Sequence, residues 1–347
     1  MMIAARMRGQ QGPGPITKTP MTTPTRRQIL IASAGPALLA LAPLAQASSF
    51  PERPFNFICP WPAGGTADLT MRALCSAAAK VLGQTIVFEN KAGASGMLGL
   101  KAMLGAKPDG YTICQIPISV VRFAQLGSVQ IDPAKDLSYL ARTSGQTFGI
   151  AVRADSPHRS LIELVAAAKT APGKVSYGSS GIGGATHVGM EEFALAAGVQ
   201  FNHIPYKGDA PALQDLLGGQ IDALADSSTW APHVKAGKLR LLATWGETRT
   251  RDFAEVPTLR EQGFDVVVDA PNGVGAPRGL EPAIEKRLRE AFKASANSAD
   301  FQAACDKIDA PVMYLDGPDY EKYVATTLRK EIQLIERLKL RELLAKG

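Results

Sequence analysis

The chain has 347 residues, of which 46% are hydrophobic and 20% are charged, a composition typical of folded globular proteins and a length that favours two domains. Its formal net charge of +6 would fit a nucleic-acid-binding protein, but five basic residues lie in the first 47 positions, which hold no acidic residue. The rest of the chain carries 33 basic and 32 acidic side chains. The charge therefore argues against nucleic acid as a partner.

Residues 1–47 have the pattern of an export leader. Arg26-Arg27 come just before an apolar stretch at 29–44, and Ala45-Gln46-Ala47 fits a small-x-small cleavage site. The paired arginines are typical of a twin-arginine signal, and two prolines in a short stretch argue against a membrane anchor. We expect cleavage near Ala47 and a periplasmic mature protein, with Met21 as an alternative start.

The segment after the leader predicts a β-α-β-α-β order. Strands are expected at 55–60, 85–89 and 111–116, with a short helix at 96–104. The helix expected at 66–82 has Thr66 as its N-cap and Gly83 as its stop. This order favours a parallel sheet with helices on both faces.

A second β-α repeat follows. Strands are expected at 148–153, 175–177, 200–204, 220–225 and 239–245, and helices at 161–170 (with Ser160 as N-cap), 186–197, 210–217 and 232–236. The segment 264–270 is expected to be extended, and helices follow at 281–296, 298–307 and 318–344. The prediction is an α/β protein with two lobes, each a mainly parallel sheet flanked by helices. The chain crosses near Gly149 and Gly263, so lobe 1 comprises 48–148 and 263–347, and lobe 2 comprises 149–262.

Two Gly-rich loops, one in each lobe, have the same design. Trp61-Pro62-Ala63-Gly64-Gly65-Thr66 and Ser179-Ser180-Gly181-Ile182-Gly183-Gly184-Ala185-Thr186 each join an expected strand to a helix start. A helix start presents unpaired N–H groups and a partial positive charge. Two such ends predict a small anionic ligand bound from both sides in a cleft between the lobes.

Four side chains near these loops have both a binding and a structural interpretation. Asp68 either orients the loop or contacts a ligand donor group, or it is a first-turn carboxylate stabilised by the helix dipole. Asp226 either contacts a ligand at its strand end or makes a hinge or turn hydrogen bond. Trp61 either covers the cleft or packs beside its neighbouring prolines. His187 either faces the ligand or is a capping or packing histidine.

A catalytic alternative is a secreted serine-type hydrolase that uses Ser179 or Ser180 with His187 and Asp226. The sequence has no G-x-S-x-G elbow, and it lacks H-E-x-x-H, P-loop and G-x-G-x-x-G motifs. We therefore expect no catalysis, no metal and no cofactor. The cysteines show no C-x-x-C spacing, which favours buried free thiols.

Ordered motifs over nearly the whole mature chain resemble those of the tripartite tricarboxylate transporter substrate-binding proteins, the Bug receptors, which are periplasmic type II solute-binding proteins. The matching segments are Pro60-Trp61-Pro62-Ala63-Gly64-Gly65-Thr66-Ala67-Asp68, Glu89–Gly96, Pro108–Thr112, Tyr177–Gly181, Ile204–Gly208, Ala210–Asp222 and Val256–Thr258. The resemblance implies a Venus-flytrap fold, a small carboxylate ligand and no catalysis. It also implies a membrane permease as the partner in uptake, with ligand sensing as the other possible role. We expect the protein to be a monomer.

Carried over by position, the resemblance implies a set of ligand-binding residues. These are Trp61, Gly64, Gly65, Thr66, Ala67 and Asp68 in the first loop, Ser179, Ser180, Gly183, Gly184, Ala185, Thr186 and His187 in the second, and Asp226. Where the family usually has a Gly/Ser/Thr-rich loop, this chain has Ile116-Pro117-Ile118-Ser119. Ser119 is therefore the main polar candidate on a more apolar third wall.

Overall fold

The computed structural model describes residues 14–15, 50–268 and 270–345. The expected export leader and its cleavage near Ala47 lie almost entirely outside these residues. Among the described helices, none is both long and apolar enough to span a bilayer.

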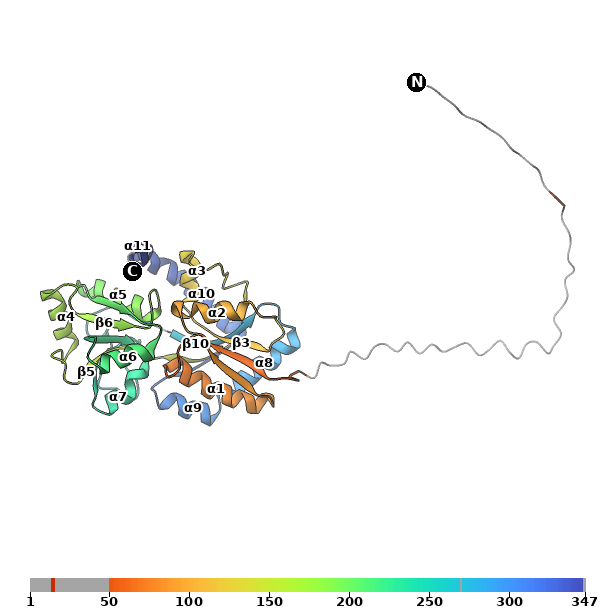
Figure 1. Cartoon of the computed structure of the whole chain (residues 1–347), viewed down its shortest axis with the longest axis horizontal. Coiled ribbons are helices and arrows are strands. Elements are labelled where there is room, and N and C mark those ends of the chain that lie inside the picture. Colours follow the sequence, from red (N-terminus) through yellow and green to blue (C-terminus); the bar gives the residue numbers. More distant parts are fainter. Residues whose placement is uncertain (1–13, 16–49, 269, 346–347) are drawn as a thin grey trace, which may run out of the picture. The chain divides into compact units, whose positions relative to one another are not determined.

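The first lobe is built on a six-stranded sheet in the order β11-β4-β10-β3-β1-β2 (Figure 1). Its strands are β1 Phe55–Cys59, β2 Ile86–Asn90, β3 Thr112–Ile116, β4 Leu137–Gln146, β10 Ala270–Pro277 and β11 Val312–Asp316. Its helices are α1 Thr66–Leu82, α2 Met97–Leu104, α3 Val120–Leu126, α8 Pro282–Ala296, α9 Ala299–Asp306, α10 Gly317–Arg337 and α11 Leu340–Ala345, with a 3-10 turn at Ala94–Gly96.

The second lobe is built on a five-stranded sheet in the order β7-β6-β8-β5-β9. Its strands are β5 Gly149–Arg153, β6 Ser176–Ser179, β7 Asn202–Pro205, β8 Ala223–Asp226 and β9 Leu239–Thr244. Its helices are α4 Leu161–Thr170, α5 Ala185–Ala197, α6 Asp209–Leu217 and α7 Ala231–Lys235, with a 3-10 turn at Ser228–Trp230. Figure 1 shows these helices grouped apart from α1, α2, α8 and α9.

The two-lobed α/β fold predicted from the sequence is confirmed, but the sheets are mixed rather than mainly parallel. In the first sheet β1 pairs in parallel with β2 and β3, whereas β10 runs antiparallel to both β3 and β4. In the second sheet β5 runs antiparallel to β8 and β9. The βαβ units are parallel as expected, and the antiparallel pairings arise where the chain passes from one sheet to the other.

Each sheet has its own hydrophobic core. Phe57, Met71 and Phe292 are fully buried in the first, and Tyr177 and Phe193 in the second. The strands divide between the sheets in the order the sequence indicated, although the boundaries at 148/149 and 262/263 stay a prediction. Separate cores allow two lobes to move as units about the segments that join them.

The C-terminal helices pack on the first lobe and also reach the second. α10 contacts α3 and β4 of the first sheet. Ile335 of α10 and Leu340 of α11 share a small buried cluster with Val188 of α5. This cluster connects the helix that follows the second Gly-rich loop to the far end of the chain.

Candidate functional site

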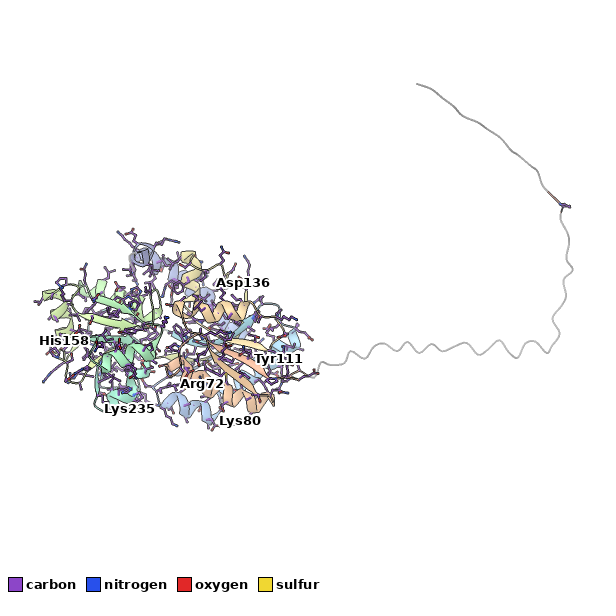
Figure 2. The ribbon with its side chains drawn as sticks, viewed as in Figure 1. Arg72, Lys80, Tyr111, Asp136, His158 and Lys235 are labelled. Atoms are coloured by element: carbon purple, nitrogen blue, oxygen red, sulfur yellow. The ribbon has the colours of Figure 1, made fainter. Side chains whose placement is uncertain are left out.

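The first Gly-rich loop, between β1 and α1, is organised by Asp68. The Asp68 carboxylate is buried and accepts hydrogen bonds from the Gly64 N–H at 3.0 Å, from Arg72 Nε at 3.0 Å and from Asn90 Nδ2 at 2.8 Å. Arg72 lies on α1 nearer the second lobe than Lys80 does (Figure 2). Gly64 has φ of +86°, a conformation that favours glycine. Asp68 thus holds the loop in shape, which is the loop-orienting role considered for it from the sequence.

Thr66 does not cap α1 as the sequence predicted. The N-cap is Gly65, and Thr66 is the first helical residue. The Thr66 hydroxyl is fully buried and shares a 2.9 Å hydrogen bond with the Ser227 hydroxyl of the second lobe, so it is engaged across the cleft instead of in its own turn. The predicted stop at Gly83 is confirmed, with φ of +69°.

The second loop, between β6 and α5, is held by its own side chains. The Thr186 hydroxyl accepts from the Ser180 N–H at 3.1 Å and lies 2.9 Å from the Ser180 hydroxyl. Gly184 is the N-cap of α5 and adopts an extended conformation. Gly183 has φ of +71°, and its N–H donates to His187 Nδ1 at 3.0 Å. The loop's N–H groups are thereby fixed in direction.

His187 belongs to a stack of aromatic rings behind the second loop. Its ring lies 4.0 Å from that of His203, and His203 stacks in turn on Tyr177. Burial lowers the pKa of His187 to about 3, with smaller electrostatic effects from the neighbouring His203 and Arg122. Burial alone lowers the pKa of His203 to about 4. Both rings are therefore neutral at ordinary pH.

The serine–histidine pairing expected of a hydrolase is absent at His187 among the described residues. Ser179 instead lies 2.6 Å from His203 Nε2, and it also accepts the Gly181 N–H at 3.3 Å. Ser179 is fully buried, so its hydroxyl is not open to a substrate. The arrangement supports a structural role for both Ser179 and His187.

A cavity of about 30 Å³ lies where the two loops meet. Five of the fifteen predicted binding residues line it: Trp61, Ala67, Ser119, Ser180 and Ala185. The other residues of the wall were not predicted from the sequence to bind ligand. They are Gln115, Pro117, Ile118, Gln146, Phe148, Asp209, Ala270 and Pro271. The other ten predicted residues do not line it.

The cavity holds polar groups of both kinds. Trp61 Nε1 is a buried donor with no partner in the described structure, and Ser119 and Ser180 add hydroxyls. Ala67 and Ala185 stand in the first turns of α1 and α5, where backbone N–H groups lack intrahelical partners. These groups can bind an anion from both lobes.

An acidic pair lies on the second-lobe side. Asp209, the first residue of α6, lines the cavity and accepts a hydrogen bond from Ser227. Asp226 is completely buried, does not line the cavity, and accepts from Thr229 at 2.8 Å. Burial and the neighbouring Asp209 carboxylate raise the pKa of Asp226 well above its ordinary range. Asp209 was not among the binding residues predicted from the sequence.

The lobes touch each other around the cavity. Ser95 Oγ donates to the Ile182 carbonyl at 2.7 Å, and Arg122 Nη1 donates to the Gly183 carbonyl at 2.8 Å. Both bonds run from the first lobe to the second loop. The structure is therefore a closed arrangement.

Other side-chain chemistry is sparse. Within 50–268 and 270–345 no group of three or more His, Cys, Asp or Glu side chains is placed to hold a metal. The four cysteines are buried and free, as predicted. Burial raises the pKa of Cys59 and of Cys305 to about 12, so both are inert thiols.

Comparison with known proteins adds four similarities. The sequence description of the tripartite tricarboxylate transporter family receptor (TctC) matches residues 70–340. A Cupriavidus necator protein, the UPF0065 protein in the gbd 5' region, is 42% identical over 91% of this chain and 96% of its own. The solved structure of the periplasmic binding protein BugD has a TM-score of 0.80, 29% identity, and coverage of 84% of this chain and 99% of its own. The structure titled R. palustris Rpa4515 with adipate has a TM-score of 0.79, 26% identity, and coverage of 84% and 98%.

Proposed function

This chain belongs to the tripartite tricarboxylate transporter receptor family, the Bug receptors, and from that premise we propose that it binds a small carboxylate in the cavity between its two Gly-rich loops. The proposal places the mature protein in the periplasm as a monomeric receptor, without cofactor or turnover. It delivers its ligand to a membrane permease or reports ligand to a sensor. The neighbour solved with adipate supports a carboxylic acid as the class of ligand.

One observation carries the proposal. Ala67 and Ala185 both line the cavity, so the N-terminal turns of α1 and α5 meet at one point from opposite lobes. Hydrogen bonds to a charged group contribute about 1.5–3 kcal/mol each. Three or four of them, divided between lobes, are enough for an affinity near micromolar, which corresponds to about −8 kcal/mol.

Such a ligand also stabilises the closed state. Both sets of donors converge only when the lobes are together, so the ligand binds the closed state more tightly than the open one. A cavity of about 30 Å³ has room for roughly two waters. A ligand with several carbons therefore holds the lobes slightly farther apart than they are here.

The test is to identify ligand retained on mildly purified protein by mass spectrometry and to titrate a panel of carboxylic acids by calorimetry. Ser180→Ala removes a cavity hydroxyl, and we expect affinity to fall about tenfold because a hydrogen bond to a charged group is lost. Ser160→Ala is the matched control, since Ser160 caps α4 and does not line the cavity.

Two results would overturn the proposal. The first is a broad acid panel that gives neither heat nor thermal stabilisation at millimolar concentration. The second is turnover of esters or amides that Ser179→Ala abolishes, which would establish the hydrolase alternative despite the burial of Ser179.

A further inference from the structure

The cavity wall contains one buried acceptor that no described residue satisfies. Gln115 lies on β3, is only 1% exposed and lines the cavity. Its Nε2 donates to Asn272 Oδ1 at 3.1 Å, whereas its Oε1 has no hydrogen-bond partner. A buried acceptor left unpaired is costly, so it marks where a ligand donor would bind.

The orientation of the Gln115 amide is fixed by its neighbours. Asn272 Nδ2 faces the Thr70 hydroxyl at 3.4 Å and the Gly145 carbonyl at 3.5 Å. The Thr70 hydroxyl donates its own proton to the Thr66 carbonyl at 2.9 Å, so it can only accept from Asn272, as can the Gly145 carbonyl. Asn272 must therefore present its NH₂ group to them.

The position of the Asn272 amide oxygen follows from that of its NH₂ group. Its Oδ1 accepts from Gln115 Nε2 and also from Gln146 Nε2 at 3.0 Å. Gln115 cannot flip without placing its own oxygen against that of Asn272. In this orientation Gln115 Oε1 is the amide atom left without a partner among the described residues.

A second acceptor faces the same cavity from the other lobe. Asp209 lines the wall and forms no ion pair among the described residues. One of its oxygens accepts from Ser227, and the buried Asp226 lies beside it. A carboxylate here repels an ionised ligand carboxylate and attracts a hydroxyl or, more strongly, an ammonium group.

We propose that the carboxylate bound by this receptor also carries a hydrogen-bond donor, a hydroxyl or ammonium group, that contacts Gln115 Oε1 and Asp209. This inference rests on the proposed function and narrows its ligand to hydroxy or amino acids with an acidic end. The anion occupies the donors of the two loops, and the ligand's own donor occupies the two acceptors.

Calorimetry on the full mature chain with acids matched in length tests this. The sets are succinate, malate and aspartate, then glutarate, 2-hydroxyglutarate and glutamate. Within at least one set we expect a donor-bearing acid to bind ten to a hundred times more tightly than the plain diacid, because the plain diacid leaves a buried acceptor unpaired.

Two variants assign the preference to the proposed groups. Gln115→Met keeps the side chain's length and removes its acceptor, so the preference for a donor should shrink about tenfold while plain-diacid affinity holds. Asp209→Asn removes the charge, so ammonium ligands should lose more affinity than hydroxyl ligands. Gln125→Met on α3, outside the cavity, is the control, and urea midpoints check that each variant folds.

The outcomes separate the inference from the proposed function. If plain diacids bind as tightly as their donor-bearing partners, or if Gln115→Met retains the full preference, the inference is wrong while carboxylate binding stands. If no acid of either kind binds, the proposed function and the inference both fail.

Discussion

Asp68 shows how one buried charge can serve a binding loop without touching the cavity. Its carboxylate accepts three kinds of donor, from Gly64 in the loop, Arg72 in the helix and Asn90 at the end of β2. Hydrogen bonds to an ionised acceptor are about twice as strong as neutral ones. The loop therefore holds its shape before any ligand arrives, which lowers the entropic cost of binding.

Replacing Asp68 by Asn should loosen this loop. Asp68→Asn places an NH₂ group among donors, so we expect about 1–3 kcal/mol lower unfolding free energy and weaker carboxylate binding. Urea titration and calorimetry measure the two effects. Asp300 on α9 forms an exposed ion pair with Lys80, which lies on the same helix as Asp68. Asp300→Asn breaks that pair and should change little. Equal effects of the two variants would contradict the role given to Asp68.

The two stacked histidines predict a pH dependence. The pKa of His187 is lowered to about 3 and that of His203 to about 4, below their ordinary value of 6.5, because both rings are buried. Below pH 6.5 the unfolded chain binds protons that the folded chain does not. The stability they contribute is therefore complete above pH 6.5 and is lost as pH falls towards 4 and then 3.

A double variant isolates this effect. Urea unfolding at several pH values between 4.5 and 8 should give a steeper loss of stability for the parent chain than for His187→Gln/His203→Gln. His158→Gln, a histidine outside the stack (Figure 2), controls for removing a histidine elsewhere. The same acid slope in the parent and in the double variant would rule out the stack as its source.

At the scale of elements, the clearest coupling is a buried ion pair between α3 and α10. Arg122 and Glu331 are joined by two bonds of 2.7 Å, and both side chains are less than 10% exposed. The remaining Arg122 bond goes to the Gly183 carbonyl in the second loop. The pair therefore orients a donor from the first lobe towards the second.

Glu331→Gln should weaken both folding and binding. It leaves Arg122 buried without a counter-charge, a change that typically costs about 3–5 kcal/mol, and it loosens the contact with the second loop. Glu321→Gln on the same helix breaks an exposed pair with Arg278 and is the matched control. Urea midpoints and calorimetric affinities decide. If Glu331→Gln binds carboxylates as tightly as the control variant, the Arg122–Glu331 pair does not influence the binding site.

The sequence predicted the elements with strong local signals and missed those set by tertiary packing. Both strand–loop–helix units could be predicted because apolar runs end in glycines before a helical pattern. β10 reads APNGVGAP, which local preferences assign to a turn, yet it lies in the middle of a sheet. A Cβ at Gly273 would sit 2.1 Å from the Tyr320 hydroxyl, so the glycine is there for a close approach from α10.

The site was predicted in part for the same reason. The loops and Ser119 carry local signals, whereas Gln115, Asn272 and Asp209 come together only through the sheet order and the closure of the lobes. The helix N-cap at Thr66 was wrong because its hydroxyl bonds to Ser227, far away in sequence. Contacts between lobes leave no trace in the spacing of residues.

At the scale of the whole molecule, residues 50–268 and 270–345 form two lobes closed on a small cavity. Cross-lobe bonds from Ser95 and Arg122, and the hydroxyl pair of Thr66 and Ser227, hold the second loop against the first lobe. A second, larger cavity of about 1400 Å³ lies beside the segment 246–251 and α10. The proposed receptor uses the small cavity, because only there do the two helix N-termini meet.

A crystal structure of the mature chain with a carboxylate that calorimetry shows to bind tests this most directly. We expect the carboxylate oxygens between the first turns of α1 and α5, within hydrogen-bond distance of the Ser180 hydroxyl or Trp61 Nε1. Density for the acid in the larger cavity, with the space between the two loops filled only by water, would contradict the account.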